Sequence, residues 1–289
     1  VLKKEMPIWA PRIRELNEQM PEATEDDIAW ALIEEIAAEK AGILKRDVPI
    51  IYIGKEEKSA KVIREFAEKV GAPCREISKN AYEIQEITSK DIAFSITNAY
   101  YENSIWKLGT KALYQVENAM LALEAMRYLV KEEKHLNRWK EALYKTHWEG
   151  RMEEILPGVI LDGAHNPGAV EVFVESVNAQ QENNFEKIIL FSAVKEKEYE
   201  TMIRMLCETI DAKEYILTQI ENERGVSTEE LAGVFRKYTD KKIIEEENLE
   251  KAFCMALKEK GENDRVYCLG SLYLVGMLKE LIVGGKKHA

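Results

Sequence analysis

The stretch VILDGAHNPGAV, residues 159–170, combines residue types that can do chemistry in a short junction. An apolar run ends on Asp162, and His165, one of only 4 histidines, stands just before Asn166 and Pro167. Asn is a favoured helix N-cap, and Pro fits the first helical turn because its missing N–H has no partner there. The sequence therefore predicts a strand that ends at Asp162 and a helix that begins at Pro167.

Such a junction is typical of an anion-binding site. Ligands of open α/β sheets bind outside the carboxyl ends of the strands, and a helix N-terminus favours negative charge. Asp162 is placed to accept from hydroxyl or amide donors, and His165 to meet a phosphate oxygen. A well-capped turn with a surface histidine explains the same residues, and this stretch alone does not decide between the two interpretations.

The elements that must position these residues alternate regularly after residue 159. Five apolar runs read as strands, and each is followed by an amphipathic segment at helical spacing. This order predicts a mostly parallel, Rossmann-like α/β sheet. The predicted strands are VILD, IILFSAV, EYILTQI, IIE and VYCLG, and the helices begin near Pro167, Tyr199, Thr228, Leu249 and Leu272.

The preceding part of the chain has a different pattern. A helix capped by Thr24 and stopped by Gly42 is followed by the strand VPIIYIG and a helix that ends at Gly71. Alternating β-branched and aromatic residues from Cys74 to Leu113 predict antiparallel strands, and helices return over residues 116–130 and 138–144. We place a domain boundary near Gly150, which gives domains at residues 1–150 and 151–289.

Composition excludes several classes of protein. The 289 residues have a formal net charge of -11, which argues against a broad nucleic-acid footprint. No apolar run approaches the roughly 20 residues that span a bilayer. The 4 cysteines form no CxxC pair, and no signal-like apolar stretch lies near Val1, so we expect a cytoplasmic protein. The first residue is not Met, which indicates a fragment or a trimmed chain.

Five segments together resemble one family. DGAHNP after GRME resembles the C-terminal domain of the folylpolyglutamate synthase and dihydrofolate synthase family, within the Mur ligase superfamily. IAAEKAGILK, LYQVENAMLAL, SAVKEKEYETM and CLGSLYLVG are similar to other family segments in the same order, LYQVENAMLAL to its HQ-x-x-NA helix start. The resemblance extends from about Ile33 to Leu281. It implies a remnant of the central ATPase-type domain followed by a Rossmann-like ligase domain.

The resemblance implies a ligase of folate and one-carbon metabolism. ATP would phosphorylate the carboxylate of a folate or dihydropteroate compound, and the amine of L-glutamate would attack the acyl phosphate to form an amide. Magnesium and basic groups would neutralise the phosphates. The family also implies a monomer, and the charge and the lack of a long apolar run lead us to expect neither nucleic acid nor membrane as a partner.

Site residues follow from the same resemblance. Asp162 and His165 would contact the nucleotide from the C-terminal domain, Arg151 would reach its phosphates, and Asn118 would meet it from the first domain. Lys40, in EKAG, matches a lysine that carries a carbamate near the metal ions. Lys40 and His165 are thus the catalytic candidates.

Ser271 lies in the predicted turn after the last strand, where a structural role explains it as well as cofactor binding does. Lys40 likewise reads as an ordinary surface lysine when its helix is considered without the family.

The sequence departs from the family in two places. It contains no GxxxxGK[ST] phosphate-binding loop, because GKE at 54–56 and GKK at 285–287 lack the Ser or Thr. No histidine precedes His135, so the family's Asp-His pair before EKAG is absent. We therefore predict that this chain alone does not catalyse ligation. The alternative is a truncated, non-catalytic homologue that binds a ligand or a partner.

Overall fold

The computed structural model describes residues 10–101, 104–130, 135–180, 185–221 and 223–285, so the segment around Val1 lies outside the described residues. Two compact units form. The first takes in Val1–Gln85, Ala93–Lys107 and Gln115–Tyr144, and the second Glu86–Ile92, Leu108–Tyr114 and Lys145–Ala289. The domain boundary near Gly150 stays a prediction. Among the described residues, no helix is long and apolar enough to cross a membrane.

The second unit contains a six-stranded sheet in the order β10-β9-β8-β11-β7-β6. All neighbours pair in parallel except β6, which is antiparallel to β7. The prediction of a mostly parallel α/β sheet is confirmed. Its strands are β6 (Glu153–Leu156), β7 (Val159–Leu161), β8 (Lys187–Phe191), β9 (Glu214–Leu217), β10 (Lys242–Glu245) and β11 (Arg265–Leu269).

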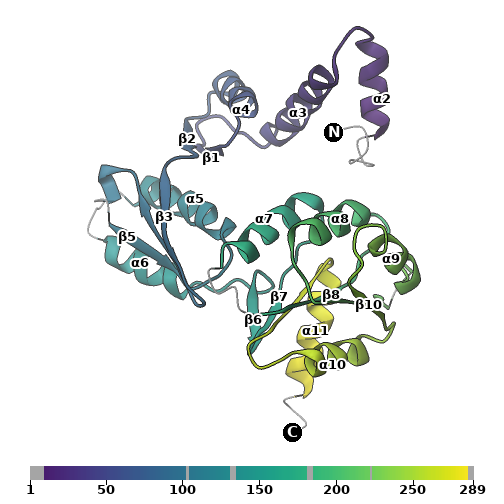
Figure 1. Cartoon of the computed structure of the whole chain (residues 1–289). Helices are drawn as coiled ribbons and strands as arrows, with labels where there is room; N and C mark the ends of the chain where they lie inside the picture. The colour runs from purple at the N-terminus through teal and green to yellow at the C-terminus, as the bar shows by residue number, and fades with distance from the viewer. Residues whose placement is uncertain (1–9, 102–103, 131–134, 181–184, 222, 286–289) are drawn as a thin grey trace. The chain divides into compact units, whose positions relative to one another are not determined.

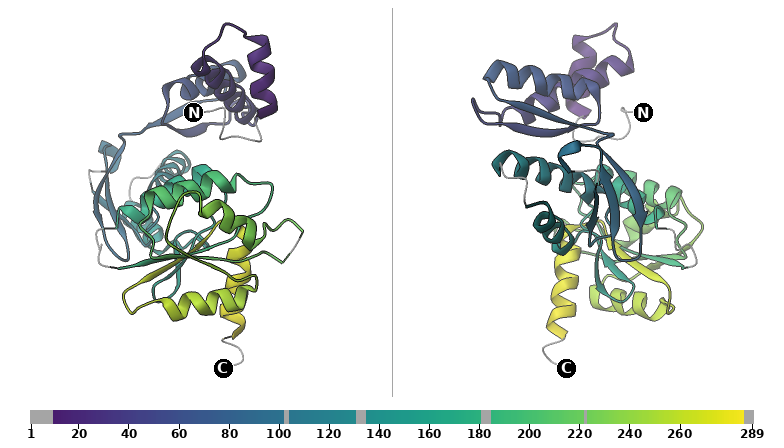
Figure 2. Two further views of the ribbon diagram at one scale, coloured as in Figure 1. Left: turned by 45° about the vertical axis from the view of Figure 1, so that its right-hand side comes forward. Right: turned by 90° about the vertical axis from the view of Figure 1, so that its left-hand side faces the viewer.

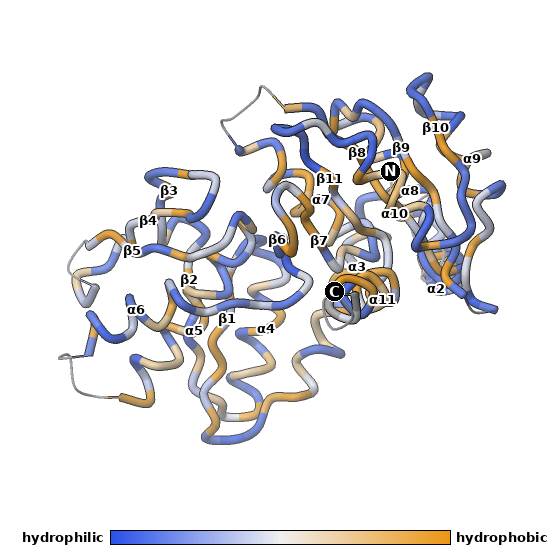
Figure 3. The backbone as a smooth tube through the Cα atoms, turned by 90° about the horizontal axis from the view of Figure 1, so that it is seen from below, coloured by the Kyte–Doolittle hydropathy of each residue, from blue (hydrophilic) through white to orange (hydrophobic). Residues whose placement is uncertain are grey.

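Helices cover both faces of this sheet (Figures 1 and 2). Alternate residues of one strand face opposite layers: Ile189 and Phe191 join one core cluster, Ile188 and Leu190 the other. Burial on both faces is the reason that these strands read as continuous apolar runs. One layer consists of α7 (Pro167–Asn178), α8 (Tyr199–Thr209) and α9 (Thr228–Phe235), and the other of α10 (Leu249–Glu259) and α11 (Leu272–Gly285). In Figure 3, α11 is seen nearly end-on and much of its visible backbone is coloured as hydrophobic.

In the first unit, α2 (Ala10–Gln19) packs against α3 (Glu25–Ala41). Thr24 caps α3: its side chain accepts from the Asp27 N–H at 3.2 Å, and Asp27 accepts from the Thr24 N–H at 2.9 Å. This reciprocal pair is a capping box, which confirms the predicted helix start. The contacts between the two helices come from Ile13, Leu16, Ile28 and Leu32.

The next elements form a β-α-β unit: β1 (Ile50–Gly54), α4 (Glu57–Val70) and β2 (Cys74–Ser78). Gly71 ends α4 in the left-handed region with φ 76°, as the predicted stop requires. The prediction of antiparallel strands from Cys74 onward is wrong for β2, which pairs in parallel with β1. The crossover through α4 returns the chain to the same end of the sheet, so the second strand must run in the same direction.

A three-stranded sheet follows, in the order β3 (Tyr82–Ile87), β4 (Ile92–Ile96) and β5 (Ile105–Leu108). Between β4 and β5, the short helix η1 (Ala99–Tyr101) carries Tyr101, whose buried ring packs edge-on against that of Trp106 at 5.7 Å. The helices α5 (Tyr114–Leu129) and α6 (Leu136–Lys145) come next, as the sequence predicts.

Candidate functional site at the carboxyl edge of the six-stranded sheet

The turn between β7 and α7, residues 162–166, forms backbone hydrogen bonds with neighbouring segments. The Asp162 N–H donates to the Cys268 carbonyl at 3.0 Å, at the end of the adjacent strand β11. The Gly163 N–H donates to the Gly150 carbonyl at 2.7 Å. The turn therefore has one conformation that both the sheet and the segment before β6 support.

The Asp162 carboxylate is an internal hydrogen-bond acceptor. Its Oδ2 accepts from the Tyr114 hydroxyl at 3.0 Å and from the Met152 N–H at 2.9 Å, and its Oδ1 from the Ala164 N–H at 2.8 Å. Only 2% of the residue is exposed. Buried polar groups are stable when they are hydrogen-bonded, and this carboxylate has three donors.

Burial raises the pKa of the Asp162 carboxyl above its ordinary value. The hydrogen bonds from Met152, Tyr114 and Ala164, and the charge of Arg151, act in the opposite direction because they favour the ionised form. The pKa of the Tyr114 hydroxyl is also raised, first by its own burial and then by Asp162, so this hydroxyl stays a donor.

Arg151 lies between two residues with left-handed backbone, Gly150 at φ 63° and Met152 at φ 47°. Both are hydrogen-bonded to the turn, Gly150 through its carbonyl and Met152 through its N–H. A Cβ placed on Gly163 would lie 2.7 Å from Arg151 Nη1, so the guanidinium reaches the turn itself. The structure thus brings Arg151, Asp162 and His165 to the same carboxyl edge.

His165 is half-buried, and its Nδ1 lies 2.7 Å from the Gly163 carbonyl oxygen. An Nδ1–H that donates to this carbonyl leaves Nε2 as an acceptor in the neutral ring and a donor in the protonated ring. Next to it, the Asn166 side chain accepts from the Ala169 N–H at 2.9 Å, and Pro167 occupies the first turn of α7. The predicted cap and helix start are confirmed.

Ser271 lies in the turn after β11 and is 2% exposed. Its hydroxyl accepts from the Tyr273 N–H at 3.1 Å, at the start of α11. The preceding Gly270 has φ 109° and donates its N–H to the Ala164 carbonyl at 2.9 Å. The turn of Ser271 therefore supports the turn of Asp162, while the cofactor role of this serine stays a prediction.

The other two predicted site residues lie in the first unit. Lys40, in the last turn of α3, has a 74% exposed side chain, and its ammonium is 3.4 Å from the Glu39 carboxylate. Asn118, on α5, is exposed and donates to the Gln115 side chain at 2.8 Å. In the described part of the chain, no group of three or more His, Cys, Asp and Glu side chains gathers as a metal site.

Sequence reasoning missed the segment that precedes α5. Lys111 is 6% exposed and forms an ion pair with Glu154 at 2.6 Å. The Leu113 N–H donates to the Ser176 hydroxyl at 3.0 Å, and Tyr114 binds Asp162. Tyr114 lies in LYQVENAMLAL, a stretch that resembles the family. The bonding partners of this segment are 43 to 63 residues further along the sequence, so no local sequence pattern identifies them.

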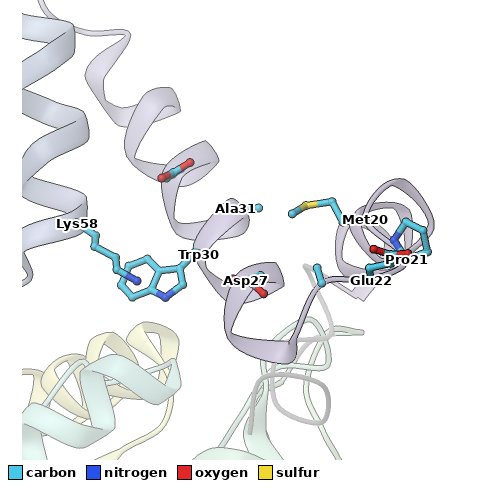
Figure 4. Close-up of a pocket in the computed structure, with 9 residues that line it drawn as sticks. Met20, Pro21, Glu22, Asp27, Trp30, Ala31 and Lys58 are labelled. Carbon is cyan, nitrogen blue, oxygen red and sulfur yellow. The ribbon is translucent and has the colours of Figure 1, made fainter.

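A pocket of about 730 Å³ lies in the first unit, between the turn after α2 and the helices α3 and α4 (Figure 4). The Lys58 ammonium lies 3.1 Å from the centre of the Trp30 ring, a cation–π contact that Figure 4 shows directly. None of the predicted site residues lines this pocket, so we place the candidate site at the carboxyl edge of the six-stranded sheet.

Comparison with known proteins finds several that are similar to this chain. The family described as Mur ligase, glutamate ligase domain matches residues 150–272, a range that contains Arg151, Asp162, His165 and Ser271. A dihydrofolate synthase/folylpolyglutamate synthase of Bacillus subtilis is 32% identical over 257 residues, which cover 86% of this chain and 58% of the relative. The chain thus spans little more than half of that protein.

Two solved structures share the fold. FolC of E. coli in complex with DHPP and ADP has a TM-score of 0.71 and 24% identity, over 88% of this chain and 57% of that one. A Mycobacterium tuberculosis folylpolyglutamate synthase complexed with ADP and AMPPCP has a TM-score of 0.73 and 18% identity, over 90% and 61%. The six-stranded, mostly parallel sheet and its carboxyl-edge turn thus lie in a region, residues 150–272, that matches the Mur ligase, glutamate ligase domain, and the chain is similar to the C-terminal portion of folylpolyglutamate synthases and dihydrofolate synthases.

Proposed function

We propose that the chain supplies the C-terminal part of an ATP-dependent ligase that adds glutamate to folates. The observation that carries the proposal is that Arg151 and His165 both reach Gly163, in the turn just before α7 and next to the buried Asp162. A guanidinium, an imidazole and a helix N-terminus at one sheet edge suit the phosphates of a nucleotide. The similarity to a dihydrofolate synthase/folylpolyglutamate synthase over 86% of the chain favours a ligase over a module that only binds a partner.

The proposed reaction has two steps. The γ-phosphoryl group of ATP passes to a carboxylate oxygen of the folate or dihydropteroate, and ADP leaves. The glutamate amine then attacks the acyl carbon, loses its proton, and displaces phosphate to give the amide. When bound, Mg²⁺ would neutralise charge on the phosphate oxygens.

The residues of this chain would contribute mainly binding and orientation. Arg151 offers a guanidinium to the phosphates, and a protonated His165 can donate from Nε2 to a phosphate oxygen. Asp162 is proposed to serve the nucleotide site through the backbone that it fixes: it binds the Met152 N–H, next to Arg151, and the Ala164 N–H, next to His165. Asn118 is proposed as a further nucleotide contact and Ser271 as a support of the turn.

Lys40 is proposed to carry a carbamate near the metal. An unmodified lysine would bring a positive charge to a cation site, which Coulomb repulsion disfavours. The exposure of its side chain leaves the amine accessible for carbamylation. Of the proposed roles, that of Lys40 depends most on the other residues of the family's active site.

The sequence has no GxxxxGK[ST] loop, and the backbone N–H groups of such a loop are the usual cradle for ATP phosphates. The test is therefore a ligation assay with ATP, Mg²⁺, L-glutamate and tetrahydrofolate, on two proteins. The chain alone should give no product. A fusion that restores the N-terminal segments of the Bacillus subtilis relative should give phosphate release that requires both folate and glutamate.

In the fusion, His165→Ala should lower the rate by a factor of about 100 or more, as loss of one contact to developing charge does. Robust ligation by the chain alone would contradict the assignment of a partial site. A fusion that folds but keeps full activity after His165→Ala would remove this histidine from the nucleotide site.

A further inference from the structure

Tyr114 is held in place at the start of α5 by the segment before it. The Lys111–Glu154 ion pair and the bond from Leu113 to Ser176 attach residues 108–114 to the second unit. Ala112, between them, is fully buried in the core cluster that includes α7 and α8. Tyr114 is half-buried and packs against the same cluster. These contacts fix the position of Tyr114, so its hydroxyl is held within reach of Asp162.

Tyr114 and Met152 bind the same oxygen of Asp162. The hydroxyl lies 3.0 Å and the Met152 nitrogen 2.9 Å from Oδ2. Met152 is a non-glycine residue in the left-handed region, a conformation that persists only where surrounding contacts fix it. The bond from its N–H to Asp162 is such a contact, and the residue that it holds in place is the neighbour, Arg151.

We propose that Tyr114 is a positioning residue of the nucleotide site: its hydroxyl fixes the Asp162 carboxylate in the orientation that holds the Met152 N–H and so sets the place of Arg151. The inference rests on the proposed function only in that the ligand of Arg151 is a nucleotide phosphate. The chain of bonds from Tyr114 through Asp162 to Met152 can be tested without any ligand.

Among the described residues, the titratable and charged side chains that act on the Asp162 carboxyl are Tyr114, from α5, and Arg151, from the segment before β6. Tyr114 donates to the carboxylate, and this bond favours the ionised form over the protonated form. Removal of the hydroxyl should therefore destabilise the protein most where Asp162 is ionised. The loss should shrink as pH falls toward the Asp162 pKa, which burial places above its ordinary value.

The first test compares Tyr114→Phe with the wild-type chain by urea unfolding between about pH 8 and about pH 5. We expect the variant to lower the folding equilibrium constant about tenfold at the upper pH, as for a lost hydrogen bond to a charged group, and less at the lower pH. Tyr238→Phe is the matched control, because its hydroxyl binds Glu200 on the exposed surface at 3.2 Å. The control should show a small change without this pH dependence.

A double-mutant cycle with Asp162→Asn gives a second readout. If Tyr114 acts through the carboxylate, Tyr114→Phe should cost much less in the Asp162→Asn background than in the wild type. Equal costs in both backgrounds, or a pH-independent loss, would show that Tyr114 contributes packing alone and would overturn the proposal. The pH series decides the matter even if Asp162→Asn does not fold.

The third readout is the dissociation constant for Mg·ADP. Tyr114→Phe should weaken binding about tenfold, and Tyr238→Phe should leave it unchanged. In one outcome, the wild-type chain binds no nucleotide even though Tyr114→Phe shows the expected pH dependence and the expected coupling to Asp162→Asn. That result would contradict the proposed function but would still support the role of Tyr114 in positioning Met152. If the wild type binds and Tyr114→Phe changes neither affinity nor pH dependence, the positioning role is refuted.

Discussion

The two units differ in how deeply their parallel strands are buried. In the second unit, β7 and β9 are buried at every position, and β8 and β11 at all but the first. In the first unit, β1 and β2 form a two-stranded sheet in which only Tyr52 and Ile77 are buried. Parallel sheets depend on coverage of both faces, so the second unit has a complete core of its own and β1–β2 does not.

This difference has a consequence for the site. The turn of Asp162 and the turn of Ser271 follow two adjacent, fully covered strands, which fix the backbone on which the side chains stand. Lys40 and Asn118 lie on exposed helical surface in the first unit. Rigid elements hold functional side chains more accurately than exposed ones. Of the proposed site residues, those at the carboxyl edge are therefore the ones that the fold of the chain holds in place.

The largest expected difference is in resistance to proteolysis. Limited digestion of the chain should leave a protected fragment that contains the six-stranded sheet and ends near α11, while β1 and β2 are cut early, because cleavage follows local opening. Mass spectrometry of the fragments over time checks this. If a fragment of the first unit is stable while the six-stranded sheet is digested, the first unit is the more resistant one, and the prediction is wrong.

The sequence predicts the second unit well for a physical reason. Its strands are short apolar runs because both faces are buried, and its helix starts at Pro167 and Thr228 carry local caps. The sequence does not predict the strand β6, EEIL, because its first two residues are acids and only two apolar residues follow. The Tyr114–Asp162 bond joins residues 48 apart, so it depends on tertiary structure that no local pattern encodes.

The next effect concerns the turn beside Ser271. Gly270 has φ 109°, and a Cβ there would lie 2.2 Å from the Ser192 carbonyl oxygen. Gly270→Ala should destabilise the second unit by about 3 kcal/mol or more, from backbone strain and overpacking together. Thermal unfolding measures the loss. Gly276→Ala is the control, since a Cβ at this helical position meets nothing within 4 Å and should be neutral or stabilising by up to about 1 kcal/mol.

A smaller effect is expected at the helix cap. Asn166→Ala removes the acceptor of the Ala169 N–H and should cost about 1 kcal/mol. Urea unfolding of the chain gives the value. A cost near zero would mean that the cap is replaced by water and does not hold the turn of His165.

The smallest effect on stability is expected at His165. Because its ring is half-buried and binds only the nearby Gly163 carbonyl among the described residues, His165→Ala should change the unfolding free energy by at most about 0.5 kcal/mol. Its effect should appear in nucleotide affinity instead. A loss as large as that of Gly270→Ala would identify the histidine as part of the core.

The most direct test of the carboxyl-edge site is a calorimetric titration of the chain with Mg·ADP, for the wild type, Arg151→Ala and Arg236→Ala. Arg236, on the surface of the same unit, pairs with Glu245 and is the control for loss of one guanidinium. We predict saturable binding that Arg151→Ala weakens about tenfold or more and Arg236→Ala leaves unchanged, as for loss of a charge-assisted contact. Equal affinity of Arg151→Ala and the wild type, or no binding by the wild type, would contradict a nucleotide site at this edge.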